Sequence, residues 1–120
     1  MIVVDRFRWG IFDAHLGGGI GSERRGRRPV LVISDEDFNL VMPVVTVLPV
    51  TSRKPGRRIY PNEVLFPKTT AGLSRESIVL AHQIRTISKN RLVKLYGYIE
   101  AFQLRTAVTD AINVHLGFGA

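Results

Sequence analysis

Residues 44–50 read VVTVLPV and form the longest apolar stretch of the chain. Valine favours an extended backbone, and a run with almost no polar residues predicts a strand that is buried on both faces. Pro49 has no backbone N–H to donate, so this end of the strand is expected at a sheet edge or a bulge. The run is much shorter than the roughly 18 apolar residues of a membrane helix. We therefore expect a core strand and no association with a membrane.

Shorter apolar runs on both sides of this stretch predict further strands, each bounded by turn residues. We expect these strands at residues 9–15, 29–34, 62–66, 77–82 and 92–99. The connections include a flexible GGGIG loop at residues 17–21, an acidic DEDFN turn at 35–39 and a basic turn at 52–58. Most of the chain is therefore predicted to be β-structure.

The hydrophobic period changes after residue 100, where apolar residues recur at helical spacing. The expected helix spans residues 100–116, and Gly117 ends it. Its apolar stripe contains Leu104, Ala107, Val108, Ala111, Ile112, His115 and Leu116. His115 is therefore expected to pack in the core or in an interface. Five to seven short strands with one terminal amphipathic helix predict a single mainly β (α+β) domain over residues 1–120, shaped as a small barrel.

The charge balance is strongly positive: 17 Lys and Arg stand against 10 Asp and Glu, a formal net charge of +7 in 120 residues. Two short loops hold eight of these cations, namely Arg24, Arg25, Arg27, Arg28, Arg53, Lys54, Arg57 and Arg58. Basic residues clustered in this way are typical of nucleic-acid binding. The alternative is that they are solvated loop charges without a partner.

The residue types on which many enzymes depend are sparse. Cysteine is absent, which excludes disulfides, thiolate metal sites and cysteine nucleophiles. The three histidines lack metal-ligand spacing, and no GxxxxGK[ST] phosphate loop occurs. We therefore expect no metal and no cofactor. The N-terminal residues MIVVDRFRWG carry charges where a secretion signal needs an apolar run, so a cytoplasmic protein is expected.

Polar residues stand at the ends of two of the expected strands. Arg28 precedes Pro29, which holds the Arg28 backbone extended, and Thr51 and Ser52 follow the strand at 44–50. If the two strands are neighbours, a guanidinium and a hydroxyl converge beside both basic loops. Such a pair can stabilise the charged transition state in which the 2′-hydroxyl of RNA attacks the adjacent phosphorus without a metal. The alternative is that Arg28 and Thr51 are ordinary turn residues.

Three sequence blocks occur in this order along the chain: GSERRGRRPVLVIS at residues 21–34, LPVTS at 48–52 and HQIRTISKNRL at 82–92. Together they resemble the MazF/PemK family of toxin endoribonucleases, and the resemblance extends from about residue 8 to residue 116. It implies an SH3-like barrel that acts as a homodimer and cleaves single-stranded RNA at short motifs without metal. The implied products carry a 2′,3′-cyclic phosphate and a 5′-hydroxyl. The implied partner is a cognate antitoxin with an acidic, disordered tail.

By this resemblance, Arg28 and Thr51 are the catalytic residues. RNA-binding residues are expected at Ser22, Arg25, Arg27, Ser52, Arg53, Lys54, His82 and Gln83. Glu23 is expected to form a salt bridge with Arg25 or Arg27 within its loop. Arg85 is expected either to brace the fold through a buried ion pair or to touch RNA.

The chain departs from the family pattern at several positions. The stretch RWGIFDAH followed by LGGG lacks the acidic residue after the first glycine and the Asp-Pro pair of relatives, so a different RNA preference is open. His82 stands where relatives often have an acid, and its alternative role is that of a hydrogen-bonded residue at a strand end. Two other functions are open for the same fold: a gyrase poison that acts by protein contact, and a basic barrel that binds RNA without cleaving it.

Overall fold

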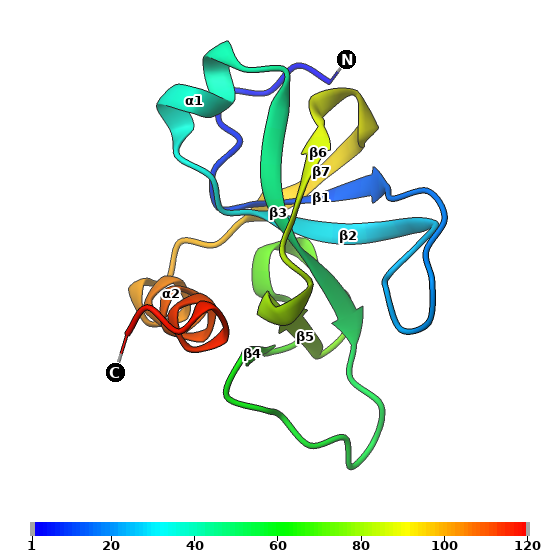
Figure 1. Ribbon diagram of the computed structural model, residues 1–120, viewed down its shortest axis with the longest axis vertical. Helices are drawn as coiled ribbons and strands as arrows, with labels where there is room; N and C mark the ends of the chain where they lie inside the picture. The colour runs from blue at the N-terminus through cyan, green and yellow to red at the C-terminus, as the bar shows by residue number, and fades with distance from the viewer. Residues whose placement is uncertain (1, 120) are drawn as a thin grey trace.

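The computed structural model describes residues 2–119, which form one curved antiparallel sheet with helices at its margins (Figure 1). The elements in chain order are β1 (Gly10–His15), β2 (Arg27–Val32), α1 (Glu36–Val41), β3 (Val44–Ser52), β4 (Glu63–Phe66), η1 (Thr70–Gly72), β5 (Ser77–Leu80), η2 (Ala81–Gln83), β6 (Arg85–Ser88), η3 (Lys89–Arg91), β7 (Leu92–Tyr98) and α2 (Phe102–Leu116). The strand order is β4-β5-β3-β2-β1-β7, and β6 also pairs with β3. Because β4 and β7 do not pair within the described residues, the sheet is barrel-like without being closed. The expected mainly β fold with a C-terminal helix is confirmed.

β3 lies at the centre of the sheet. One side of it pairs with β2 through residues 47–49, and the other side pairs with β6 through residues 44–47 and with β5 through residues 50–52. Pro49 therefore lies where the second side changes partner, a position between two ladders that tolerates a residue without an N–H. The expectation of a sheet edge at Pro49 is wrong, because this partner change makes room for the proline inside the sheet.

The core has two halves, one on each face of the sheet. Leu48 belongs to the half that α2 covers through Val108 and Ala111. Val47, the neighbouring residue of β3, belongs to the other half. Since successive strand residues point to opposite faces, this arrangement confirms that the strand is buried on both sides.

α2 differs from the expected helix in where it begins and in the burial of its last turn. It begins at Phe102 rather than at residue 100, since Ala101 keeps an extended backbone and offers no side-chain cap. His115 and Leu116 are exposed, so a place for them in the core of this chain is wrong: the last turn of α2 reaches past the two core halves, and His115 contacts Asn62 instead. Packing of His115 in an interface stays a prediction. Gly117 ends the helix as expected, in a left-handed conformation. No helix within residues 2–119 has the length and apolarity to cross a membrane.

Three local features differ from the sequence expectations. The acidic turn expected at residues 35–39 is instead the start of α1, whose N-cap Asp35 accepts a hydrogen bond from the backbone of Asp37 at 3.0 Å. β6 lies outside the expected strands. β2 begins at Arg27, so Arg28 lies within the strand rather than just ahead of it.

Candidate functional site

Arg28 and Thr51 come from two paired strands and line one pocket. β2 and β3 are antiparallel, and their ladder ends with Val30 opposite Pro49, so Arg28 and Thr51 each lie two residues beyond its last pair. Both residues, together with Ser52, line a pocket of about 360 Å³. The structure therefore brings together the two side chains that the sequence places at separate strand ends.

Three further side chains give this pocket its chemical character. Arg75 comes from the segment before β5, and Lys94 and Tyr96 come from β7. Burial, followed by the charge of Asp13, raises the pKa of Tyr96, so its hydroxyl stays protonated and can donate a hydrogen bond. The lining residues, all within 2–119, include no Asp or Glu. The pocket is thus cationic and rich in donors, as a phosphate ligand requires.

Neither Arg75 nor Lys94 was predicted from the sequence, because both lie outside the two basic loops and no motif marks them. Within the described residues the Arg28 side chain makes one hydrogen bond, in which its Nε donates to the backbone carbonyl of Arg25 at 3.3 Å. Within the described part of the chain no carboxylate pairs with this guanidinium. Its two terminal amino groups are therefore available to a ligand in the pocket.

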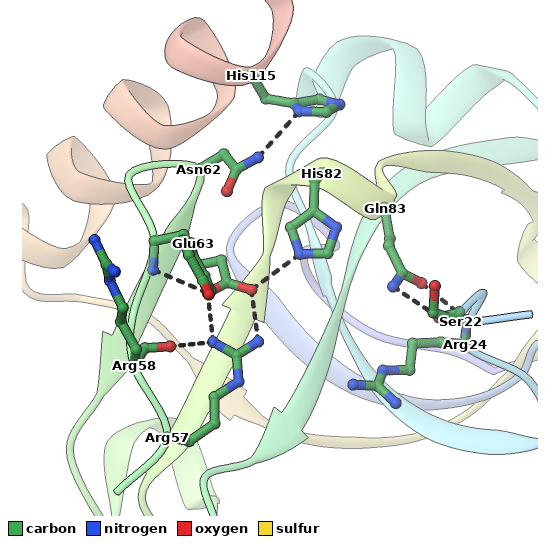
Figure 2. Close-up of polar contacts among 10 residues, drawn as sticks. Ser22, Arg24, Arg57, Arg58, Asn62, Glu63, His82, Gln83 and His115 are labelled. Atoms are coloured by element: carbon green, nitrogen blue, oxygen red, sulfur yellow. Dashed lines mark hydrogen bonds and ion pairs between the residues drawn. The ribbon is translucent and has the colours of Figure 1, made fainter.

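Gln83 holds the loop that leads to Arg28. Its Oε1 accepts a hydrogen bond from the backbone N–H of Arg24 at 2.8 Å, and its Nε2 donates to the carbonyl of Ser22 at 3.0 Å (Figure 2). Arg24, His82 and Gln83 line two further pockets of about 430 Å³ and 350 Å³. Because both ends of its amide are bound to the loop, Gln83 positions that loop. A contact of Gln83 or His82 with RNA stays a prediction.

Glu63 connects the second basic loop to the same region. Its side chain is 1% exposed and accepts hydrogen bonds from Arg57 Nη1 and Nη2 at 2.7 and 2.8 Å and from the backbone N–H of Tyr60 at 3.0 Å (Figure 2). The bond from Arg57 is the main cause that lowers the pKa of Glu63 to about 2, against the opposing effect of burial. Since Glu63 is ionised, His82 Nε2 donates to it, at 2.9 Å. Glu63 therefore fixes both Arg57 and His82, a role that no sequence motif indicated.

Two of the predicted RNA-binding arginines are paired with acids. Arg27 Nε donates to the buried carboxylate of Asp13, and Arg53 Nη1 lies 3.2 Å from Glu76. These ion pairs neutralise part of the positive charge that was expected to bind RNA. The other predicted contacts outside the Gln83 region are exposed, namely Arg25, Ser52 and Lys54. Their contact with RNA stays a prediction.

The expected salt bridge of Glu23 with Arg25 or Arg27 is wrong. Glu23 Oε1 instead accepts a hydrogen bond from the backbone N–H of Ile20 at 2.7 Å, so the carboxylate stabilises a turn within its own loop. Arg85 forms no ion pair within residues 2–119 and lines the 430 Å³ pocket. In the same part of the chain, no group of three His, Cys, Asp or Glu side chains is arranged to hold a metal ion.

Known proteins resemble this chain along nearly its whole length. Residues 7–116 match the family described as PemK-like, MazF-like toxins of type II toxin–antitoxin systems. The chain is 34% identical over 110 residues to an endoribonuclease MazF of Staphylococcus saprophyticus, covering 92% of this chain and 90% of the relative. It is 35% identical over 111 residues to endoribonuclease MazF9 of Mycobacterium tuberculosis, covering 88% and 92%. A solved MazE–MazF structure from Deinococcus radiodurans contains a similar chain, with TM-score 0.69, 28% identity and coverage of 93% and 96%.

Proposed function

Because this chain belongs to the PemK-like, MazF-like toxins of type II toxin–antitoxin systems, we propose that it is an endoribonuclease that cleaves single-stranded RNA at short motifs without a metal ion. Two relatives named endoribonuclease MazF, 34% and 35% identical over most of the chain, support the activity. The observation that carries the mechanism is that Arg28 and Thr51 line one cationic pocket. These two residues are the catalytic pair of the proposal.

The attacking group in this mechanism is the 2′-hydroxyl of the substrate. Its oxygen forms a bond to the neighbouring phosphorus while the bond from phosphorus to the 5′-oxygen breaks. The proton of the 2′-hydroxyl passes to water, and water returns a proton to the leaving 5′-oxygen. The products are a 2′,3′-cyclic phosphate and a 5′-hydroxyl, and no water is consumed.

The protein contributes hydrogen-bond donors and positive charge. Arg28 is a permanent cation whose terminal amino groups donate to the non-bridging phosphate oxygens, and the Thr51 hydroxyl donates to the same group. A donor that is already in place where negative charge develops contributes about 2.7–4 kcal/mol to the rate. Arg75 and Lys94 line the same pocket and add positive charge that offsets the charge of the bound RNA.

The same charge supports the proposed partners. An acidic, disordered antitoxin tail is attracted by the +7 surface just as RNA is, so binding of the tail excludes the substrate without a separate regulatory site. The solved MazE–MazF structure supports such a pairing by similarity. We propose further that residues 1–120 act as a single domain, that two copies form a homodimer, and that the protein works in the cytoplasm, where transcripts are found.

Incubation of single-stranded RNA with the protein in excess chelator tests the mechanism. We expect 2′,3′-cyclic phosphate and 5′-hydroxyl ends, and loss of cleavage in Arg28→Ala and Thr51→Val. Lys68→Ala is the matched control, because it removes an exposed cation that lines none of the pockets described above. Cleavage that requires magnesium, or that survives Arg28→Ala, contradicts the mechanism. Protection of RNA without cleavage would indicate a binding protein, and inhibition of gyrase without cleavage would indicate a gyrase poison.

A further inference from the structure

Tyr96 of β7 brings a hydroxyl group to the wall of the pocket that Arg28 and Thr51 line. In the described part of the chain no residue forms a hydrogen bond with this hydroxyl, and its oxygen is open to solvent. Tyr98, two residues further along β7, differs in this respect, because its hydroxyl donates to the backbone carbonyl of Arg6. Tyr96 therefore offers a free hydrogen-bond donor at the pocket where the proposed function places the phosphate.

The position of Tyr96 is fixed by close packing on its backbone and its ring. η1 lies so close that a Cβ at Gly72 would be 2.6 Å from the carbonyl oxygen of Tyr96, and a Cβ at Gly97 would clash with η1 in turn, at 2.8 Å. The ring packs against the core half that α2 covers, and Lys94 Nζ lies over it, 5.5 Å from the ring centroid. A side chain held in this way keeps its geometry while the charge of a ligand changes.

A buried carboxylate lies between two residues of the same pocket. Asp13 of β1, the strand between β2 and β7 in Figure 1, is opposite Pro29 on one side and Lys94 on the other. Burial, and then the charge of Asp13, raise the pKa of Tyr96, while Arg27 opposes them. Tyr96 therefore keeps its proton at neutral pH. Because Arg27 Nε already donates to Asp13, the carboxylate is paired and the Tyr96 hydroxyl stays available to a ligand.

We infer that Tyr96 is a further catalytic residue, whose hydroxyl donates a hydrogen bond to a non-bridging oxygen of the phosphate in the pocket of Arg28 and Thr51. This inference rests on the proposed function. Negative charge builds on the non-bridging oxygens as the 2′-oxygen attacks, and a donor that is already in place on a strand stabilises this charge without reorganising. The hydroxyl keeps its proton throughout, so the products of cleavage are unchanged.

Tyr96→Phe tests the inference, because it removes the hydroxyl and keeps the ring and its contact with Lys94. Tyr98→Phe is the matched control: it makes the same change on the same strand, in a residue that lines none of the pockets described above. Single-turnover cleavage of one short RNA in chelator, over a range of protein concentrations, gives the maximal rate constant and the half-saturating concentration.

We expect Tyr96→Phe to lower the maximal rate constant by about 10–100-fold, the effect of one hydrogen bond to a charged group. The half-saturating concentration should change less, since the contact strengthens in the transition state. Tyr98→Phe should keep the wild-type rate constant, even though it loses the bond to Arg6. Denaturant unfolding of both variants shows that they are folded in the assay.

A second readout uses the two phosphorothioate diastereomers of the scissile phosphate, in each of which sulfur replaces one non-bridging oxygen. Sulfur accepts a hydrogen bond more weakly than oxygen, so in one diastereomer the substitution weakens the contact with Tyr96. The slowing caused by this sulfur should be smaller in Tyr96→Phe than in the wild type, and unchanged in Tyr98→Phe. A structural role of the hydroxyl would not produce this pattern.

Wild-type cleavage by Tyr96→Phe overturns the inference, and would show that Tyr96 acts through its ring, as in stacking on a base. An equal loss in Tyr96→Phe and Tyr98→Phe overturns it as well, and so do equal effects of sulfur in the wild type and Tyr96→Phe for both diastereomers. Failure of the wild type to cleave RNA in chelator would instead refute the proposed function. Full activity of Tyr96→Phe beside an inactive Arg28→Ala would refute this inference alone.

Discussion

Arg28 and Thr51 line one pocket, each two residues beyond the Val30–Pro49 pair that ends the β2–β3 ladder, although the whole of α1 and most of both strands separate them along the chain. In an antiparallel pair, the start of one strand lies beside the end of the next. The two side chains therefore line the same pocket from two strands of the sheet rather than from flexible loops. Donors on rigid strands keep their geometry while the charge on a bound phosphate changes.

This relationship predicts that the two residues act as a unit. Arg28→Ala and Thr51→Val should each lower kcat by about 10²–10³-fold, because each removes one donor to the same phosphate group. The fold-decrease in kcat of the double variant should be smaller than the product of the two single decreases. Once either residue is removed, the remaining donor contributes less to the reaction. Single-turnover cleavage by the four proteins measures this coupling. Fully multiplicative losses would show that the two residues act independently.

The meeting of Arg28 and Thr51 in one pocket could be predicted from the sequence, but the other residues of that pocket could not. Arg28 and Thr51 stand at strand ends within recognisable motifs, and neighbouring strands commonly pair. Arg75 and Lys94 reach the same pocket only because the sheet curves, and curvature leaves no local pattern in the sequence. The ion pair of Arg27 with Asp13 is likewise a contact between strands, which a run of arginines does not reveal.

For the fold as well, the sequence predicted the features that depend on local patterns and missed those that depend on tertiary contacts. Apolar runs located most strands because hydrophobic patterning is local. The short strand β6 was missed because its four residues, RTIS, are mostly polar. Pro49 indicated an edge or a bulge by its chemistry, and only the change of partner from β6 to β5 explains its place inside the sheet. His115 follows the helical period of α2 but lies beyond the core that the period is meant to cover.

The low pKa of Glu63 predicts that stability depends on acid pH. Its carboxyl has a pKa of about 2 in the folded protein against an ordinary 4.5. Each pKa unit is worth about 1.4 kcal/mol, so ionised Glu63 contributes about 3 kcal/mol to the free energy of unfolding at neutral pH. Because the folded pKa is the lower one, this contribution is complete above about pH 5 and is lost as the pH falls towards 2. Denaturant unfolding at a series of pH values measures it.

Glu63→Gln isolates this effect. The variant should be less stable than the wild type at neutral pH, and the gap should close as the pH is lowered, since the wild type then protonates the same group. Glu100→Gln is the matched control: Glu100 is 69% exposed, and its ion pair with Arg6 should leave little pH-dependent difference. A constant gap between wild type and Glu63→Gln down to low pH would show that packing, not charge, accounts for the role of Glu63.

The two hydrogen bonds of Gln83 predict that it controls the order of the loop containing Arg24. Gln83→Leu removes both bonds, each worth about 0.5–1.5 kcal/mol. We expect amide hydrogen exchange at Arg24 to become about 10–100-fold faster and kcat to fall, because this loop leads directly to Arg28 at the start of β2. Gln103→Leu, on the exposed face of α2, should change neither quantity. Unchanged exchange at Arg24 would mean that other contacts hold the loop.

The position of Gly72 predicts that this wall of the pocket has no room for a larger side chain. It lines the pocket of Arg28 and Thr51 with a φ of +82°, and a Cβ there would lie 2.6 Å from the backbone oxygen of Tyr96. Gly72→Ala therefore combines the strain of a left-handed backbone, about 1–2 kcal/mol, with a clash against β7 that only backbone movement can relieve. Gly56 has a φ of +75° with nothing within 4 Å of its Cβ position, so Gly56→Ala measures the backbone strain alone. We expect Gly72→Ala to be less stable than Gly56→Ala by about 1–3 kcal/mol and to lose cleavage activity that Gly56→Ala retains. Equal stability of the two variants in denaturant unfolding would show that β7 yields without cost and that the wall is not rigid.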